Sequence, residues 1–403
     1  MNRIADTTET GATVSVWRFV AACSLITLGA CILALALRGN HAAKSDYITY
    51  WAAGQQLIHR GNAYDGAAIL KIERTAGYDA DRPFFMRNPP TAFFMALPLG
   101  LFGASFGAVV WSLAMIAALM RSARILWIIH GRPPDRLHLL SYCFPPAFAC
   151  LLTGQIGIFL LLGIALFLHL HSSKPLLAGA ALLLCSLKPH LFLPVVLVLL
   201  AWIVTRKAYR VLVGILIALL ASVTFAIFLD PAAWSHYIHM VRTANIQVEY
   251  IPTVSLMLRL AVHPAYVWLQ LCPTLVAGVW ALWYFWTRRD QWKWIEHGSL
   301  LLIVSVLTAP YAWFTDQVIL VPALLHAIYL SRSRSVLAIL AMVAGAVAIL
   351  VSRGVSLMHS SLPVWTSVAW LAVYLYASKL KAAEHLSASP PANEIVLLST
   401  TQA

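Results

Sequence analysis

Residues 210–229 read RVLVGILIALLASVTFAIFL, and this stretch decides the class of the protein. After Arg210 it contains no charged residue, and as a helix it is long enough to cross ~30 Å of hydrocarbon. The whole chain has the same character, because 61% of its 403 residues are hydrophobic and only 11% are charged. A soluble domain carries roughly a quarter charged residues. The sequence therefore predicts an all-α polytopic membrane protein.

Similar apolar runs occur along most of the chain. Those that cross, or nearly cross, a bilayer cover residues 16–37, 104–127, 139–152, 156–170, 175–187, 190–205, 210–229, 264–287, 297–309, 316–331, 335–352 and 361–378. They predict a bundle of about twelve transmembrane helices. The runs between 139 and 205 are short, and Pro145, Pro146 and Pro194 interrupt them. We expect kinked or re-entrant helices there, buried by their neighbours.

Basic residues predict the orientation of this bundle. They gather in alternate connections and after the last run, at Arg121, Arg124, Arg132, Arg136, Arg206, Lys207, Arg210, Arg288, Arg289, Lys293, Arg332, Arg334, Lys379 and Lys381. With about twelve crossings, these groups fall on one side of the membrane together with both termini. The positive-inside rule makes that side cytoplasmic. The net charge of +13 is accordingly assigned to anionic membrane lipids, and we expect no nucleic-acid partner.

The expected organisation is one integral membrane domain over 1–381 and a disordered cytoplasmic tail over 382–403. The first run is too long for the apolar part of a signal peptide, so it is expected to remain as an uncleaved span. Loops 38–103 and 230–263 then face outward, with short amphipathic helices. The six cysteines lie in apolar runs without disulfide or zinc spacing, and no metal or cofactor is expected.

The outer loop after the first run begins with the polar and aromatic stretch SDYITYW at residues 45–51. Asp46 is a candidate general base, placed near the membrane surface where it can accept a proton from a sugar or lipid hydroxyl. A solvated loop carboxylate is the alternative. Tyr47 and Tyr50 are candidates for stacking on a sugar ring, or for an aromatic belt at the membrane interface.

Two cations are candidates for binding a phosphate. Lys188 stands between apolar runs on the predicted outer side, where a lysine is costly unless it is paired or snorkels to water. Arg87 precedes Asn88 and two prolines, which also have the structural role of fixing an extended entry to the next helix. Charge-assisted hydrogen bonds to a phosphate suit both side chains.

The remaining candidate residues for substrate binding lie at other outer corners. Gln155 follows Gly154 between two apolar runs, and Tyr311, Trp313 and Asp316 form a polar and aromatic corner. Asp316 is either functional, as acids at membrane depth usually are, or a helix cap. His236 and His239 have a spacing compatible with a metal, but no carboxylate accompanies them at ligand spacing. An amphipathic interfacial helix is the alternative for that segment.

In this order these motifs resemble glycosyltransferase family 87, which includes polyprenol-phosphate-mannose-dependent mannosyltransferases. The resemblance extends over about 40–330, although Phe314-Thr315 precede Asp316 where family members often have a nearby histidine. It implies the GT-C fold, a helical membrane bundle with an outward cavity, and inverting transfer of a sugar from a polyprenyl phosphate. On this chain it implies that Asp46 is the general base and that Lys188 holds the donor phosphate.

The predicted function is transfer of a mannose-like hexose from a polyprenyl-phosphate carrier to a lipid or glycan acceptor. We expect this at the outer, periplasmic face of a bacterial inner membrane. A lipid-linked glycan ligase or polymerase is one alternative, although it would hold more arginines in its outer loops. A transporter or flippase is another, and would show polar residues at mid-membrane or repeated halves. Here the charges lie at helix ends, which favours an enzyme.

Overall fold

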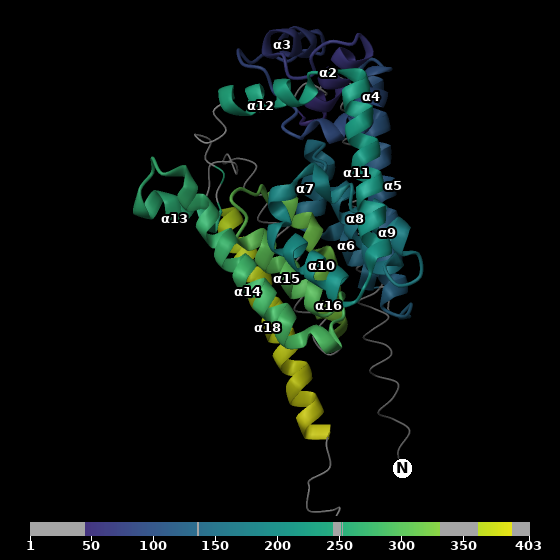
Figure 1. The fold of residues 1–403 in the computed structure, drawn as a ribbon, viewed down its shortest axis with the longest axis vertical. Helices are drawn as coiled ribbons and strands as arrows, with labels where there is room; N and C mark the ends of the chain where they lie inside the picture. The colour runs from purple at the N-terminus through teal and green to yellow at the C-terminus, as the bar shows by residue number, and fades with distance from the viewer. Residues whose placement is uncertain (1–44, 135–136, 245–250, 252, 331–361, 389–403) are drawn as a thin grey trace, which may run out of the picture.

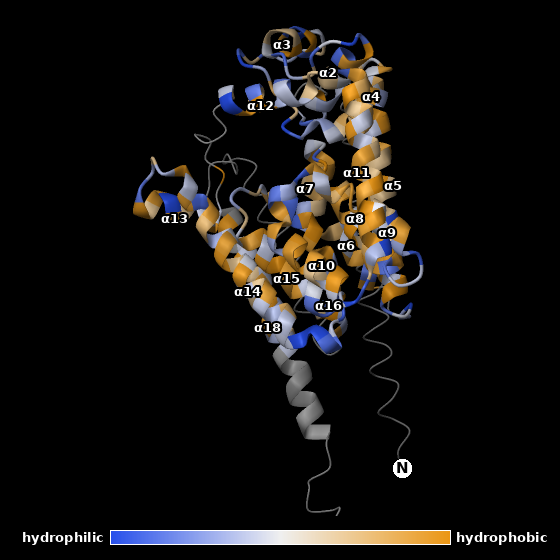
Figure 2. Ribbon diagram, in the orientation of Figure 1, coloured by the Kyte–Doolittle hydropathy of each residue, from blue (hydrophilic) through white to orange (hydrophobic). Residues whose placement is uncertain are grey.

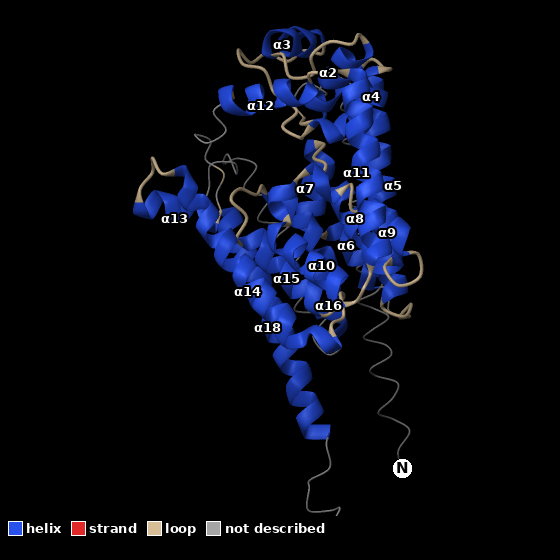
Figure 3. Ribbon diagram, viewed as in Figure 1, coloured by secondary structure: helices blue, strands red, loops and turns tan. Residues whose placement is uncertain are grey.

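The computed structural model describes residues 45–134, 137–244, 251, 253–330 and 362–388. Every regular element within these ranges is a helix (Figures 1 and 3). The all-α class predicted from the apolar runs is therefore confirmed. The predicted runs 16–37 and 335–352 lie outside the described residues, as does the end of the chain from 389.

Three described helices are long and apolar enough to cross a membrane. They are α5 (Ala104–Ile129), α11 (Tyr209–Leu229) and the continuous helix Val267–Gln291, which contains α14 (Cys272–Arg288). The described parts of the other apolar runs form shorter apolar helices, so the predicted count of about twelve full crossings is not confirmed.

The shorter apolar helices pack among these three (Figure 1). They include α8 (Gly157–Leu170), α9 (Pro175–Ala181), α10 (Leu193–Thr205), α15 (His297–Leu307), η10 (Phe314–Leu320) with α16 (Val321–Leu330), and the apolar stretch Thr366–Ser378 of the longer helix α18 (Leu362–Ala388). At 1.5 Å per residue, α8 is only ~21 Å long. Helix α18 continues to Ala388, into the segment that the sequence assigns to the tail.

Proline determines where one predicted run breaks. Residues 139–152 divide into α6 (Leu140–Cys143) and α7 (Pro145–Thr153), with the backbone extended at Phe144. Pro145 disfavours a helical conformation for the residue before it and is itself suited to the first position of a new helix. The predicted interruption is therefore confirmed at this site.

The described part of the predicted outer loop 38–103, from residue 45 on, folds as a helical cap with α2 (Tyr47–Ile58), α3 (Gly66–Thr75), η3 (Pro90–Ala92) and α4 (Phe93–Gly100). The sequence after Trp51 predicts a short amphipathic helix along the membrane interface; in the structure it belongs to α2, nine of whose twelve residues are buried in protein. Helix α4 covers it, and a Cβ atom on Gly54 would lie 2.1 Å from the Ala96 carbonyl oxygen. Glycine allows this close crossing of α2 and α4.

The second outer loop contributes α12 (Ala233–Thr243) and α13 (Val254–Val262). On α12 the buried residues Ala233 and Met240 are seven positions apart, on one face of the helix, and on α3 only Ile69 and Glu73 are buried. Helices α3 and α12 are therefore short amphipathic helices, of which the sequence predicts α12, around His236, but not α3.

Two basic connections lie together at the other end of the bundle. The Arg206 guanidinium, after α10, donates hydrogen bonds of 2.7 Å to the carbonyl oxygens of Arg289 and Asp290, after α14. Figure 2 shows hydrophobic residues along the middle of the helices and hydrophilic residues at α3 and α12 and at the turns below. This arrangement agrees with the one-sided clustering of positive charge on which the predicted orientation depends.

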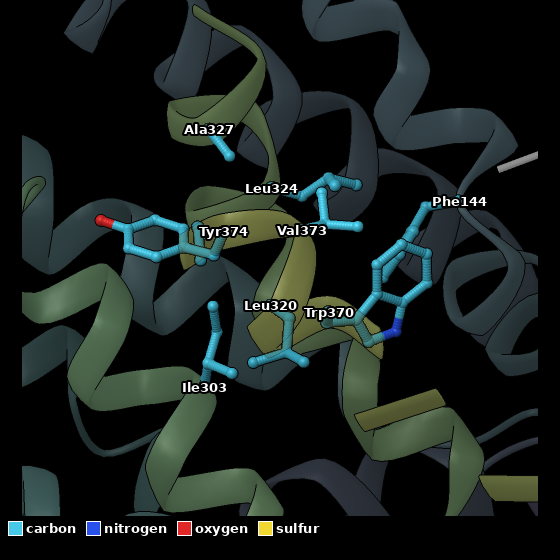
Figure 4. Close-up of a pocket in the computed structure, with 9 residues that line it drawn as sticks. Phe144, Ile303, Leu320, Leu324, Ala327, Trp370, Val373 and Tyr374 are labelled. Carbon is cyan, nitrogen blue, oxygen red and sulfur yellow. The ribbon is translucent and has the colours of Figure 1, made fainter. Parts of the chain in front are cut away.

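A small apolar cavity lies beside the contact between α16 and α18 (Figure 4). It is lined by Phe144, Ile303, Leu320, Ala323, Leu324, Ala327, Trp370, Val373 and Tyr374. The buried Gln317 side chain of η10 donates to Thr366 and Ser367 and accepts from Trp370, which fixes η10 against α18. None of the predicted site residues lines this cavity.

Candidate active site

Asp46 lies at the start of α2, where its backbone N–H donates to the Thr153 carbonyl at the end of α7 with a distance of 2.7 Å. An Asp at this position usually caps its helix, as Asp65 does for α3. Within the described residues, however, the Asp46 carboxylate makes no bond to the amides of α2. It points instead toward Gln155, from which it accepts a hydrogen bond.

The surroundings of Asp46 shift its titration. Loss of hydration on burial raises the pKa of the carboxyl from its ordinary 3.8 to about 6, although the hydrogen bond from Gln155 and the charges of Lys188 and Arg87 oppose the change. A carboxylate with a pKa near neutrality is a stronger base than an ordinary aspartate and is still ionised at pH 7. These properties fit the predicted role of a general base.

The corner between α7 and α8 positions Gln155. Gly154 ends α7 with a positive φ of 76°, and a Cβ atom there would lie 3.0 Å from the Tyr47 backbone nitrogen. The Trp111 indole of α5 donates to the Gly154 carbonyl at 2.8 Å. Only glycine takes up this conformation and this contact without strain, so the backbone places the Gln155 side chain beside Asp46.

Four predicted residues form one continuous polar chain, which runs Asp46–Gln155–Lys188–Asp316. The Lys188 Nζ atom donates to Gln155 Oε1 at 3.3 Å and to Asp316 Oδ1 at 2.6 Å. The Lys188 and Asp316 side chains are only 12% and 1% exposed, so this lysine is paired within the protein rather than snorkelling to water. The structure therefore brings together residues from four separate segments of the sequence.

Asp316 has two partners. Its Oδ2 accepts a hydrogen bond of 2.9 Å from the Trp313 backbone N–H at the start of η10, and its Oδ1 pairs with Lys188. The predicted capping role and an ion pair thus coexist in one carboxylate. Trp313 is half-buried, and its backbone rather than its indole makes this contact.

Sequence reasoning missed Asn88 as part of this site. Its Nδ2 donates to the Leu187 carbonyl at 2.8 Å, and it accepts from the Tyr50 hydroxyl at Oδ1 and from the Tyr64 hydroxyl at its own carbonyl. Asn88 therefore ties the segment that carries Arg87 to the residue before Lys188. The signal available in the sequence was an asparagine directly before two prolines.

The tyrosines that the sequence predicts to contact the substrate differ in their exposure to solvent. The Tyr47 ring is 2% exposed and points at Gly107 of α5, and Tyr50 is 5% exposed and stacks on Trp111. Protein covers both rings. Tyr311 is 39% exposed, and its ring lies 3.8 Å from the ring of His190.

His236 lies outside the polar chain. Its Nδ1 atom is 2.8 Å from Asp230 Oδ2, and the other oxygen of Asp230 accepts from the Ala232 backbone N–H near the start of α12. Helix α12 packs near the active-site segment through Tyr237, whose ring lies 5.5 Å from that of Tyr64. Among the described residues, no three His, Cys, Asp or Glu side chains gather to hold a metal ion.

The polar chain stands at the helix ends opposite the basic turns. Helix α8 begins just after Gln155 and α10 soon after Lys188, and α10 ends at the Arg206 turn. Helix α15 returns from the other basic turn to the corner that carries Asp316. An acid, a buried ammonium and a further cation, Arg87, are therefore collected at one end of an apolar bundle.

Comparison with known families assigns the chain. The family model for glycosyltransferase family 87 matches residues 85–310, which is more than half of the chain. The match contains Arg87, Gln155 and Lys188, whereas Asp46 and Asp316 flank it. No curated protein and no solved structure matches. The resemblance noted from the motifs is confirmed, and the chain belongs to glycosyltransferase family 87.

Proposed function

We propose that this membrane glycosyltransferase moves a hexose, mannose-like, from a polyprenyl-phosphate carrier to the hydroxyl of a lipid or glycan acceptor, with inversion. The observation that carries the proposal is the chain Asp46–Gln155–Lys188. In it, the Gln155 amide hydrogen-bonds at one end to a candidate base, Asp46, and at the other end to a candidate phosphate-binding cation, Lys188. A sugar phosphate needs a cation at its leaving group and a base at the attacking hydroxyl.

In the proposed reaction, the acceptor oxygen attacks the anomeric carbon on the face opposite the phosphate. Its proton passes to Asp46 as the new glycosidic bond forms. The bond from the anomeric carbon to the phosphate oxygen breaks, and the phosphate leaves with the electron pair. An ammonium has three N–H donors, and two of those on Lys188 already serve Gln155 and Asp316. The third is left for the phosphate.

Arg87 is the second cation of the proposed donor site. Its charge acts on both Asp46 and Tyr311, which supports its inclusion in the same site. Tyr311 and Trp313 would border the sugar from this side. His236 would contact the acceptor beyond Tyr64 and Tyr237.

We further propose that the site faces the periplasm of a bacterial inner membrane, with both chain termini in the cytoplasm. The position of the polar chain opposite the basic turns supports this orientation, since basic connections favour the cytoplasmic side. The carrier lipid would approach laterally from the membrane, its phosphate at the level of Lys188.

Purified protein tests the proposal directly. It is incubated with polyprenyl-phosphate mannose or polyprenyl-phosphate glucose, radiolabelled in the sugar, and with a bacterial envelope lipid extract as the acceptor. Asp46→Asn should lower transfer at least ~100-fold, because general-base catalysis contributes about 10²–10⁴.

The matched control is Asp65→Asn, an exposed acid on the same segment that only caps α3. This control should keep its activity. Transfer by Asp46→Asn at near the wild-type rate would refute the assignment of the base.

A further inference from the structure

The amide of Gln155 is held at both ends by ionic groups. Its Nε2 donates to Asp46 Oδ2, and its Oε1 accepts from Lys188 Nζ at 3.3 Å. A carboxylate can only accept hydrogen bonds and an ammonium can only donate them. The two neighbours therefore fix which end of the amide faces which group.

The position of this amide is set before any substrate arrives. The backbone of the preceding Gly154 packs against Tyr47, and its carbonyl is held by the Trp111 indole. On the far side, the Lys188 ammonium is anchored by Asp316 at 2.6 Å. Gln155 has little freedom to turn away, so both of its hydrogen bonds are preorganised.

We propose that Gln155 is a positioning residue that couples the base Asp46 to the donor-side cation Lys188. Gln155 hydrogen-bonds to Oδ2 of the Asp46 carboxylate, so that Oδ1 is presented to the acceptor hydroxyl. Through its other hydrogen bond, it links the carboxylate to the Lys188 ammonium. This inference rests on the proposed function. In the reaction the hydroxyl proton passes to Asp46 Oδ1, while Gln155 keeps its own protons and touches no reacting atom.

The electrostatics of Asp46 support this role. Burial raises the pKa of Asp46, and among the opposing influences the hydrogen bond from Gln155 is the largest. Asp46 interacts electrostatically with the ionisable groups of Lys188, Arg87, Asp316, Tyr50 and Cys150. Without the amide, the carboxylate would lose a charge-assisted hydrogen bond and would gain a proton at higher pH.

The variant Gln155→Met tests the coupling, because it keeps a similar side-chain volume and removes both hydrogen bonds. We expect the midpoint of the kcat–pH profile to rise by roughly one unit, with about a tenfold loss of kcat below that midpoint. In Gln155→Glu, a carboxylate facing Asp46 should move the midpoint still higher. The assay uses the two labelled polyprenyl-phosphate sugars and the envelope lipid extract.

Gln55→Met is the matched control. The Gln55 amide of α2 also makes two hydrogen bonds, to the carbonyl oxygens of Gly100 and Phe102, but it is not part of the polar chain. This variant should leave the pH midpoint of activity unchanged. A wild-type midpoint in Gln155→Met, or an equal shift in Gln55→Met, would overturn the inference.

A second measurement does not require turnover. The melting temperature is recorded from pH 4 to pH 8 for the wild type, Asp46→Asn, Gln155→Met and the double variant. The part of the pH dependence that disappears with Asp46→Asn reports the titration of Asp46. It should extend to higher pH in the Gln155→Met background. The absence of that extension refutes the coupling, whereas absence of sugar transfer by the wild type refutes only the proposed function.

Discussion

Removing one partner of the Lys188–Asp316 ion pair should destabilise the protein more than removing both. The two side chains are 12% and 1% exposed, and their charged atoms are 2.6 Å apart. Loss of one partner from a buried pair costs about 3–5 kcal/mol, because the other charge remains buried without its counter-ion. Replacing both charges by neutral groups of similar volume is often close to neutral. Lys188→Met and Asp316→Asn should each be destabilising, and the double variant should recover most of the loss.

The choice of substitutions keeps the other contacts intact. An Asn at 316 still offers an oxygen to the Trp313 backbone N–H, and a Met at 188 follows the path of the lysine stem. Thermal unfolding of detergent-purified protein, followed by tryptophan fluorescence, should show single variants lower by roughly 5–10 °C. Single variants that melt within about 1 °C of wild type, or a double variant that loses the sum of both, would refute the reasoning.

Three further predictions concern groups near the site. Because Asp46 must be ionised to act as the base and its pKa is about 6, transfer should be full above about pH 7 and fall about tenfold per pH unit below 6, which a kcat–pH profile measures. Gly154→Ala should lower the free energy of unfolding by about 1–2 kcal/mol because of the positive φ, and by more because the new Cβ atom contacts Tyr47. Gly77 also has a positive φ, but nothing lies within 4 Å of the place a Cβ atom would take, so Gly77→Ala should show only the cost of the backbone conformation. Melting curves of the two alanine variants, together with transfer assays, check this difference. Burial raises the pKa of Glu73 from 4.5 to about 7, so its contribution to stability is full below pH 4.5 and about 3 kcal/mol of it is lost as the pH rises through 7. Glu73→Gln should flatten that part of the melting temperature–pH curve, and an unchanged slope would contradict the assignment.

The apolar runs predict the helical class and most helix positions, because burial in a membrane or among helices requires continuous apolar sequence. The predicted number of crossings is not confirmed, because a run such as 139–152 contains Pro145 and Pro146, which divide it into two short helices. The burial of α2 in protein could not be predicted for a different reason. A local pattern does not reveal that α4 will cover the helix, since that contact depends on Gly54 and Gly100.

The site could be predicted where a single residue was chemically out of place. Lys188 and Asp316 stand out because each is a charge beside apolar sequence, where charges need partners, and Asp46 because it is an acid among tyrosines just after the first apolar run. Their pairing could not be derived, because Asp46 and Gln155 are 109 positions apart and Lys188 and Asp316 are 128 apart. Asn88 was missed because an asparagine before proline has an ordinary structural explanation.

The crossing of α2 and α4 has a consequence for where the proposed chemistry takes place. Gly54 is about two helical turns along α2 from Asp46, which corresponds to ~12 Å. A Cβ atom on Gly100 would lie 2.3 Å from the Gly54 carbonyl carbon, so α2 can neither slide nor rotate on α4 without a clash. The contact between the two glycines therefore fixes where the start of α2, and with it Asp46, stands relative to α4. A larger side chain at Gly54 or Gly100 would push the two helices apart, and would so change the distance from Asp46 to Lys188 without touching either residue.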